Sequence, residues 1–111
     1  MLKIANISLP NFPLLLAPME DVSDPPFRLV CKELGADLMY SEFISSEGLI
    51  RNAIKSKQKL DFFEYERPLG IQIFGGDEET MAMAARIVEA TNSDLLDINF
   101  GCPVKKVVCK G

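Results

Sequence analysis

The chain has 111 residues, of which 48% are hydrophobic and 25% charged, and its formal net charge at pH 7 is −4. This composition is typical of a soluble globular protein with one modest core. No apolar run approaches the ~20 residues of a membrane span, and the amino-terminal residues lack the features of a secretory signal, so we expect a cytoplasmic protein without a membrane anchor.

The first quarter of the chain predicts a lead-in, a strand and a helix. Residues 6–13 contain proline and asparagine breakers and are interpreted as one strand of a short hairpin. Residues 14–19 form an apolar strand that ends at Pro18, because proline cannot continue a central ladder. A helix begins with Asp24 as its N-cap and Pro25 as its first residue. Its apolar positions recur at helical spacing before Gly35 stops it: Phe27, Val30, Cys31 and Leu34.

The remainder repeats the same alternation. Residues 38–43 predict a second strand, residues 49–59 a helix, and residues 68–74 a third strand. Asp77 then caps a helix whose first turn is acidic and whose buried stripe is Met81, Ala84, Ala85 and Val88. Residues 95–98 predict the fourth strand, which Gly101 ends.

This order of elements predicts an α/β fold with about four parallel strands and three helices, because repeated strand–helix units with apolar strands form a parallel sheet covered by helices. A TIM (β/α)8 barrel needs about 250 residues. We therefore interpret residues 1–111 as the N-terminal half of such a barrel.

Unusual side chains lie where the four predicted strands end. They are Pro18 and Met19, Glu42, Gln72, and Asn99 followed by Cys102. Along the fourth strand Asp97 shares a face with Asn99, because side chains alternate. The carboxyl ends of parallel barrel strands converge on the face that carries active sites. Any one of these residues alone also fits a structural role, so the prediction of an active site depends on their agreement.

Cysteine and charge restrict the chemistry further. The three cysteines include no Cys-x-x-Cys pair and the chain has no histidine, so we expect neither a disulfide framework nor a metal site. The negative net charge gives no overall attraction to nucleic acid. Local basic runs, at Lys105 and Lys106 and at residues 51–59, leave an RNA contact open.

Four stretches carry a resemblance to a known family. They are Leu-Ala-Pro-Met-Glu-Asp-Val-Ser-Asp-Pro-Pro-Phe-Arg at 16–28, Ser-Glu at 41–42, Gln-Ile-Phe-Gly at 72–75 and Asp-Ile-Asn-Phe-Gly-Cys-Pro-Val-Lys-Lys-Val at 97–107. In order and spacing the chain resembles the tRNA-dihydrouridine synthases, most closely their bacterial B-type branch. The resemblance implies an FMN-dependent TIM-barrel oxidoreductase that reduces uridine in tRNA to 5,6-dihydrouridine with NADPH.

The resemblance also implies cofactor contacts at particular positions. Pro18, Met19 and Glu20 are expected to line the flavin, and Gln72 to hydrogen-bond its isoalloxazine ring. Glu20 stands where the family often has a smaller residue, which matters little if that contact is made by the backbone.

The implied substrate contacts follow the fourth strand. Asn99 is expected to help place the uracil, and Cys102 to donate the proton to C5. An unperturbed thiol, with a pKa of about 8.5, holds its proton at neutral pH and still releases it readily. Lys105 and Lys106 are expected to contact tRNA phosphates.

Two alternative functions remain open at this point. One is an FMN-dependent barrel oxidoreductase of the dihydroorotate dehydrogenase type, acting on a small pyrimidine-like substrate. The other is a non-catalytic flavin-binding or RNA-binding module. In the favoured interpretation, residues 1–111 are a truncated FMN-binding catalytic domain without the rest of the barrel and without the family's C-terminal helical tRNA-binding domain. Such a fragment is expected to be inactive, and to dimerise or swap through its open sheet edges.

Overall fold

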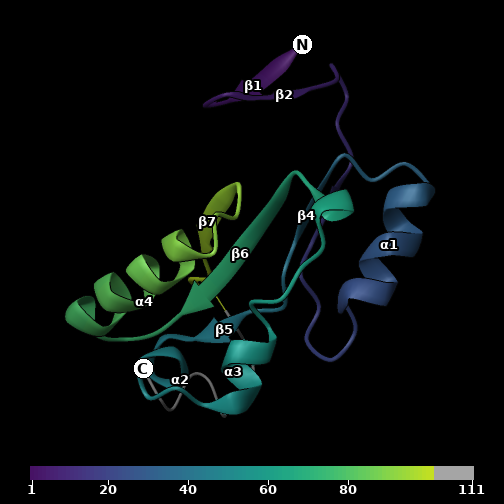
Figure 1. The fold of residues 1–111 in the computed structure, drawn as a ribbon. Coiled ribbons are helices and arrows are strands. Elements are labelled where there is room, and N and C mark those ends of the chain that lie inside the picture. Colours follow the sequence, from purple (N-terminus) through teal and green to yellow (C-terminus); the bar gives the residue numbers. More distant parts are fainter. Residues whose placement is uncertain (102–111) are drawn as a thin grey trace.

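The computed structural model describes residues 1–101 and centres on a parallel sheet (Figure 1). Its four main strands, in their spatial order, are β3 (Leu15–Leu16), β4 (Leu38–Tyr40), β6 (Leu69–Phe74) and β7 (Leu95–Ile98), and this is also their order along the chain. A short strand β5 (Ile44–Ser45) follows β4 and pairs with the carboxyl-terminal half of β6. The predicted α/β class with four parallel strands is confirmed.

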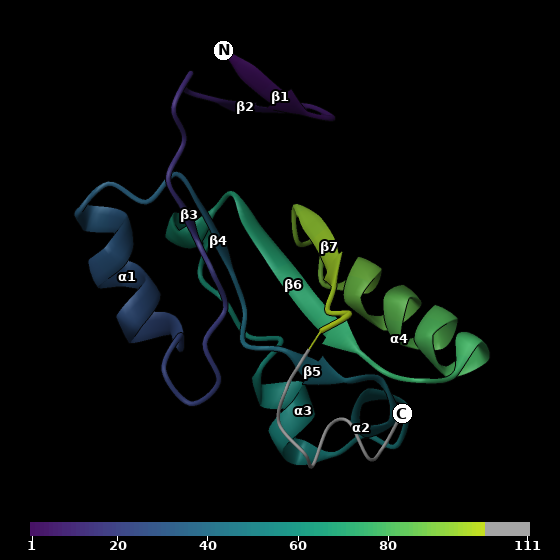
Figure 2. The same cartoon turned by 180° about the vertical axis from the view of Figure 1, so that it is seen from behind.

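Helices connect the strands, and a separate hairpin precedes them. The hairpin pairs β1 (Leu2–Ile4) with β2 (Ile7–Leu9) and lies beyond the amino-terminal end of β6 (Figure 2). The helical elements are α1 (Pro25–Glu33), α2 (Ser46–Ile50), α3 (Ile54–Gln58), the 3-10 helix η1 (Glu64–Glu66) and α4 (Glu78–Ala90). Within residues 1–101, none of the helices combines the length and apolar character needed to span a membrane.

The core lies between β6 and α4. Ile71 and Ile73 project from one face of β6 and pack with Ala84 and Val88 of the helix, all at most 1% exposed. The predicted stripe of α4 is therefore confirmed at Ala84 and Val88, while Met81 and Ala85 are partly buried. Asp77 caps the helix as expected: its carboxylate accepts hydrogen bonds from the backbone and hydroxyl of Thr80, which lower the pKa of Asp77.

One aspartate fixes the start of β7 beside β6. The Leu69 amide donates to the Asp94 carboxylate (2.8 Å), while the Asp94 amide donates to the Leu69 carbonyl (3.0 Å). Arg67 adds an ion pair to the same carboxylate at 3.2 Å. The register of the parallel pair β6–β7 that follows from this anchor places Gln72 opposite Asp97.

Two predictions about helices were wrong in detail. The helix expected over residues 49–59 is interrupted, because Asn52 adopts a left-handed conformation (φ 57°) that ends α2 before α3 begins. Asparagine tolerates this conformation better than most residues. In α1, two residues of the predicted buried stripe, Val30 and Leu34, are exposed, and the fully buried side chain is Arg28.

Candidate active site

Three polar side chains meet at the carboxyl ends of β6 and β7, and we call them the amide cluster: Gln72, Asp97 and Asn99. The Gln72 Nε2 donates to Asp97 Oδ2 at 2.6 Å, and Asn99 Nδ2 donates to Gln72 Oε1 at 3.3 Å. The Gln72 backbone amide donates to the Ser41 hydroxyl at 3.1 Å, which ties the cluster to the end of β4. The carboxyl ends of three strands are thereby joined.

The amide cluster lies on the face of the sheet opposite the α4 core. Gln72 alternates with Ile71 and Ile73, so its side chain projects away from the helix. On the same face the Tyr40 ring crosses β6 so closely that a Cβ on Gly70 would stand 2.8 Å from Tyr40 Cδ1. Burial first, and then the carboxylate of Asp97, raise the pKa of the Tyr40 phenol.

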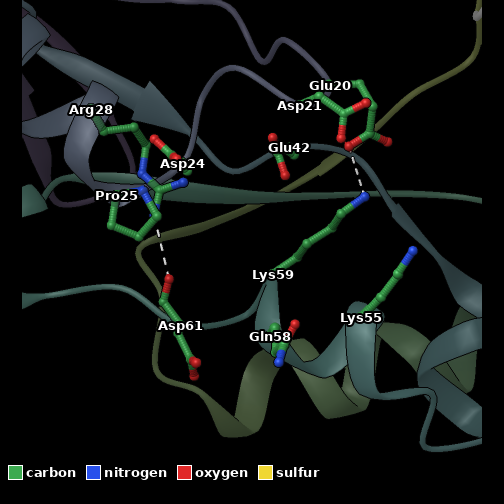
Figure 3. Close-up of a pocket in the computed structure, with 10 residues that line it drawn as sticks. All are labelled: Glu20, Asp21, Asp24, Pro25, Arg28, Glu42, Lys55, Gln58, Lys59 and Asp61. Carbon is green, nitrogen blue, oxygen red and sulfur yellow. Dashed lines mark hydrogen bonds and ion pairs between the residues drawn. The ribbon is translucent and has the colours of Figure 1, made fainter.

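A second group of polar residues lines a cavity of about 580 Å³, which we call the acidic pocket (Figure 3). Its walls come from the loop after β3, the start of α1, the end of β4 and helix α3. Carboxylate oxygens of Glu20, Asp21 and Glu42 lie within 4.8 Å of one another. The full lining is Glu20, Asp21, Asp24, Pro25, Arg28, Glu42, Lys55, Gln58, Lys59 and Asp61.

Lysines from α3 and its end offset part of this negative charge. Lys59 Nζ lies 2.8 Å from Glu20 Oε1, and the Lys55 side chain extends beside it toward the carboxylates (Figure 3). Burial is the largest cause that raises the pKa of Glu42, followed by Glu20 and Asp21, and the Lys59 ammonium works against them. Carboxylates so arranged are ordinary ligands for hard cations. The expectation of no metal site stays a prediction.

The structure brings together only some of the predicted site residues. Gln72 and Asn99 are in contact, as described. Pro18, Met19 and Glu20 lie in the loop after β3, where their hydrogen-bond partners are local or directly after α3. Within residues 1–101 no hydrogen bond joins them to Gln72 or Asn99. The predicted proton donor and the two phosphate contacts, Cys102, Lys105 and Lys106, lie outside the described residues.

Sequence reasoning missed several members of both groups. Asp97 had a usable signal, since alternation placed it on the face of Asn99, yet it was not included among the site residues. Glu42 was identified as an unusual side chain at a strand end, but it too was not included among the site residues. Lys59 gave no such signal, because a lysine in a basic run is indistinguishable from a solvated one until the loop carrying Glu20 folds against it.

A parallel sheet with a helix-packed face, and with polar side chains on its other face at the carboxyl ends of the strands, is the arrangement of enzymes built on α/β barrels. The sequence profile of the family described as dihydrouridine synthase (Dus) matches residues 15–111. The chain belongs to this family.

Curated relatives agree with the family match. The chain is 43% identical over 97 residues to tRNA-dihydrouridine synthase B of Pseudomonas syringae pv. tomato, covering 87% of this chain and 29% of the relative. It is 44% identical over 95 residues to a probable tRNA-dihydrouridine synthase of Aquifex aeolicus (85% and 30%), and 41% identical over 108 residues to tRNA-dihydrouridine synthase B of Pseudomonas aeruginosa (97% and 32%). The chain thus spans about three tenths of the length of these relatives.

Proposed function

We propose that the protein carrying this chain is a tRNA-dihydrouridine synthase, an oxidoreductase that reduces uridines of tRNA to 5,6-dihydrouridine with FMN as cofactor and NADPH as reductant. The observation that carries the proposal is the amide cluster at the carboxyl ends of β6 and β7, in a chain whose family is dihydrouridine synthase. Active sites of barrel enzymes occur at this end of the strands.

The residues present fit a flavin. After bonding Asp97 and Asn99, the Gln72 side chain keeps one N–H and one oxygen lone pair. A donor and an acceptor side by side are complementary to the pyrimidine edge of an isoalloxazine ring, which carries an N–H between two carbonyls. The cluster also holds the amide in one orientation, because the Asp97 carboxylate accepts from its N–H, while the Asn99 oxygen is taken by the Gly101 amide, which leaves the Asn99 N–H for the Gln72 oxygen.

The remaining cofactor contacts are assigned to the loop after β3. Pro18, Met19 and Glu20 would line the flavin there, with Met19 40% exposed and therefore open to contact. Glu20 would contribute its backbone, since its carboxylate is engaged by Lys59. Bound FMN would supply the hydride that NADPH provides.

The substrate side is assigned to the fourth strand and beyond. Asn99 would orient the uracil, with its Oδ1 already fixed by the Gly101 amide at 2.9 Å. The Cys102 thiol would hold its proton at neutral pH and release it to C5 of the uracil. Lys105 and Lys106 would contact tRNA phosphates, an interaction that weakens as salt concentration rises.

We further propose that residues 1–111 form the N-terminal half of an FMN-binding TIM-barrel domain, because β3, β4, β6 and β7 follow in barrel order. The protein would act in the cytoplasm, where its tRNA substrate and NADPH are both present.

The test uses the complete natural polypeptide that contains this sequence, as wild type and as Cys102→Ala. Each is incubated with FMN, NADPH and unmodified tRNA, and dihydrouridine is measured by mass spectrometry of the digested RNA. We expect the wild type to form dihydrouridine. Cys102→Ala should reduce its flavin at a normal rate yet form dihydrouridine at least 100-fold more slowly, since a positioned general acid contributes about 10²–10⁴-fold.

Two results would count against the proposal. A wild type that binds flavin but leaves tRNA unchanged while reducing free pyrimidines would favour the small-molecule oxidoreductase. Bound flavin that NADPH does not reduce would favour a non-catalytic flavin-binding module.

A further inference from the structure

The loop that follows β3 is closed by a single hydroxyl. Ser23 Oγ accepts a hydrogen bond from the Met19 amide at 2.7 Å and donates one to the Met19 carbonyl at 2.9 Å. The Val22 and Ser23 amides also donate to that carbonyl, at 3.1 and 2.9 Å. Ser23 has no exposed surface. Both backbone polar groups of Met19 are therefore fixed by a residue four positions along the chain.

This closure is needed because the loop is not relaxed. Asp21 adopts a left-handed backbone conformation (φ 62°), which costs energy for a residue with a Cβ. Such a conformation persists only where surrounding contacts determine it. The Ser23 hydroxyl supplies two of those contacts.

The carbonyl of Ser23 is in turn held by a buried guanidinium. Arg28 is 2% exposed, and its Nη1 donates to the Ser23 carbonyl at 2.7 Å. Its Nη2 donates to the Asp61 carbonyl at 3.3 Å, and its Nε pairs with the carboxylate of Glu66. Arg28 thus connects the loop after β3 with two parts of the segment that leads into β6.

The partner carboxylate is buried and fully used. Glu66 has no exposed surface, and its second oxygen accepts from the Phe63 amide at 2.7 Å. A buried ion pair of this kind usually adds little net stability compared with apolar residues of the same volume. The Arg28 guanidinium nevertheless fixes the relative positions of its hydrogen-bond partners, since it offers several donors in one rigid plane.

We propose that Ser23, Arg28 and Glu66 form a positioning relay that holds the Met19 backbone in place for the flavin. All three are positioning residues, since each is at most 2% exposed and acts through the loop after β3. This inference rests on the proposed function, because Met19 matters to a flavin only if the protein binds one. In this relay the buried Arg28 has a role that its position on a predicted amphipathic helix did not indicate.

The sharpest test is Ser23→Ala, which removes the hydroxyl and changes little volume. Ser93→Ala is the control for the serine-to-alanine change: Ser93 is partly buried, and its hydroxyl donates to a nearby backbone carbonyl, that of Leu95, at 3.3 Å. In the complete natural polypeptide, FMN dissociation constants are measured by quenching of flavin fluorescence. Melting temperatures of the flavin-free proteins, and hydrogen exchange along the whole chain, are measured beside them.

We expect Ser23→Ala to weaken FMN binding about tenfold, because two hydrogen bonds of modest net strength are lost. Hydrogen exchange in residues 19–23 should become faster than in Ser93→Ala. The melting temperature should fall modestly, because the Met19 amide loses its acceptor, while exchange in the rest of the chain stays as in the wild type. Arg28→Lys, which keeps the charge but not the fork, should weaken binding by a similar factor. Glu66→Gln should do the same, because glutamine keeps one acceptor oxygen for two donors, Arg28 Nε and the Phe63 amide.

Other results would contradict either the relay alone or the proposed function as well. Unchanged FMN affinity and exchange in Ser23→Ala would overturn the relay and leave the proposed function intact. Faster hydrogen exchange throughout the chain, and not only in residues 19–23, would mean that the hydroxyl serves general stability, and would also overturn it. A folded wild type that fails to bind FMN would overturn the proposed function, and the relay's role toward the flavin with it.

Discussion

Glu42 shows how single side chains in the acidic pocket should respond to pH. Its pKa is raised, chiefly by burial, so the folded protein holds the Glu42 proton more tightly than the unfolded chain does. Below the ordinary value of 4.5 the group is protonated in both states and contributes nothing. As pH rises above that value, ionisation of Glu42 opposes folding, and the full cost is present above the folded-state pKa.

Glu42→Gln should therefore be more stable than the wild type at pH 7, with the difference vanishing at pH 4 and below. Urea unfolding of both proteins across this pH range measures it. Glu89→Gln, at an exposed position of α4, serves as the control for replacing a glutamate by glutamine. A neutral-pH stability of Glu42→Gln below that of wild type would show that the attraction of Lys59 outweighs burial.

Single residues also mark the limit of sequence reasoning about the site. The amide cluster could be predicted in part from the sequence, because strand alternation and strand ends indicate where Gln72 and Asn99 project. The relay of Ser23, Arg28 and Glu66 could not be predicted from the sequence, since Arg28 lies within a predicted helix and its carboxylate partner is 38 residues away. Burial of a charge is decided by tertiary contacts, which no local pattern reveals.

At the scale of elements, the contact between β4 and β6 depends on one glycine. A Cβ at Gly70 would lie 2.8 and 2.9 Å from two Tyr40 ring carbons, closer than real contacts allow. Gly70→Ala should displace the ring and lower the free energy of unfolding by about 1–3 kcal/mol. Denaturant unfolding at neutral pH measures the loss.

A double-mutant cycle isolates that contact. In a Tyr40→Ala background the space is free, so Gly70→Ala should cost less than half as much as it does beside tyrosine. Equal costs in the two backgrounds would mean that the glycine is required for its backbone and not for the ring. In that case the close approach of the ring would play no part in fixing the strand pair.

Elements were predicted well where several signals agreed. For β6, a run of mainly apolar residues bounded by Pro68 and Gly75 gave the strand to within one residue, and Asp77 gave the start of α4. The single helix predicted over 49–59 was wrong because Asn52 is left-handed, a conformation that asparagine permits but does not require, so the local sequence does not reveal it. β3 is shorter than expected because only Leu15 and Leu16 pair with β4.

At the scale of the whole molecule, the described sheet has two apolar edges. Leu14 and Leu15 are 63% and 46% exposed at the β3 edge, and Leu96 and Ile98 are 40% and 43% exposed on β7. Unpaired strand edges with apolar side chains are templates for pairing with another chain. We predict that a polypeptide of residues 1–111 alone self-associates, with a second copy covering these edges.

Size-exclusion chromatography with light scattering measures this directly. The 111-residue polypeptide should elute as a dimer or larger species, and Leu96→Lys combined with Ile98→Lys should shift it toward the monomer, because charged side chains protect an edge. A stable, folded monomer of the unsubstituted polypeptide would refute the prediction. The exposed sheet edges would then not cause self-association.

The anchoring of β7 by Asp94 has a consequence for how this family can change over evolutionary time. Because side chains alternate with a period of two, the insertion of one residue between Asp94 and Asp97 would turn the strand over and present Leu96 and Ile98 where the amide cluster now lies. An insertion before Asp94 would only lengthen the turn after α4. Variation in chain length should thus accumulate on one side of this aspartate and be eliminated on the other.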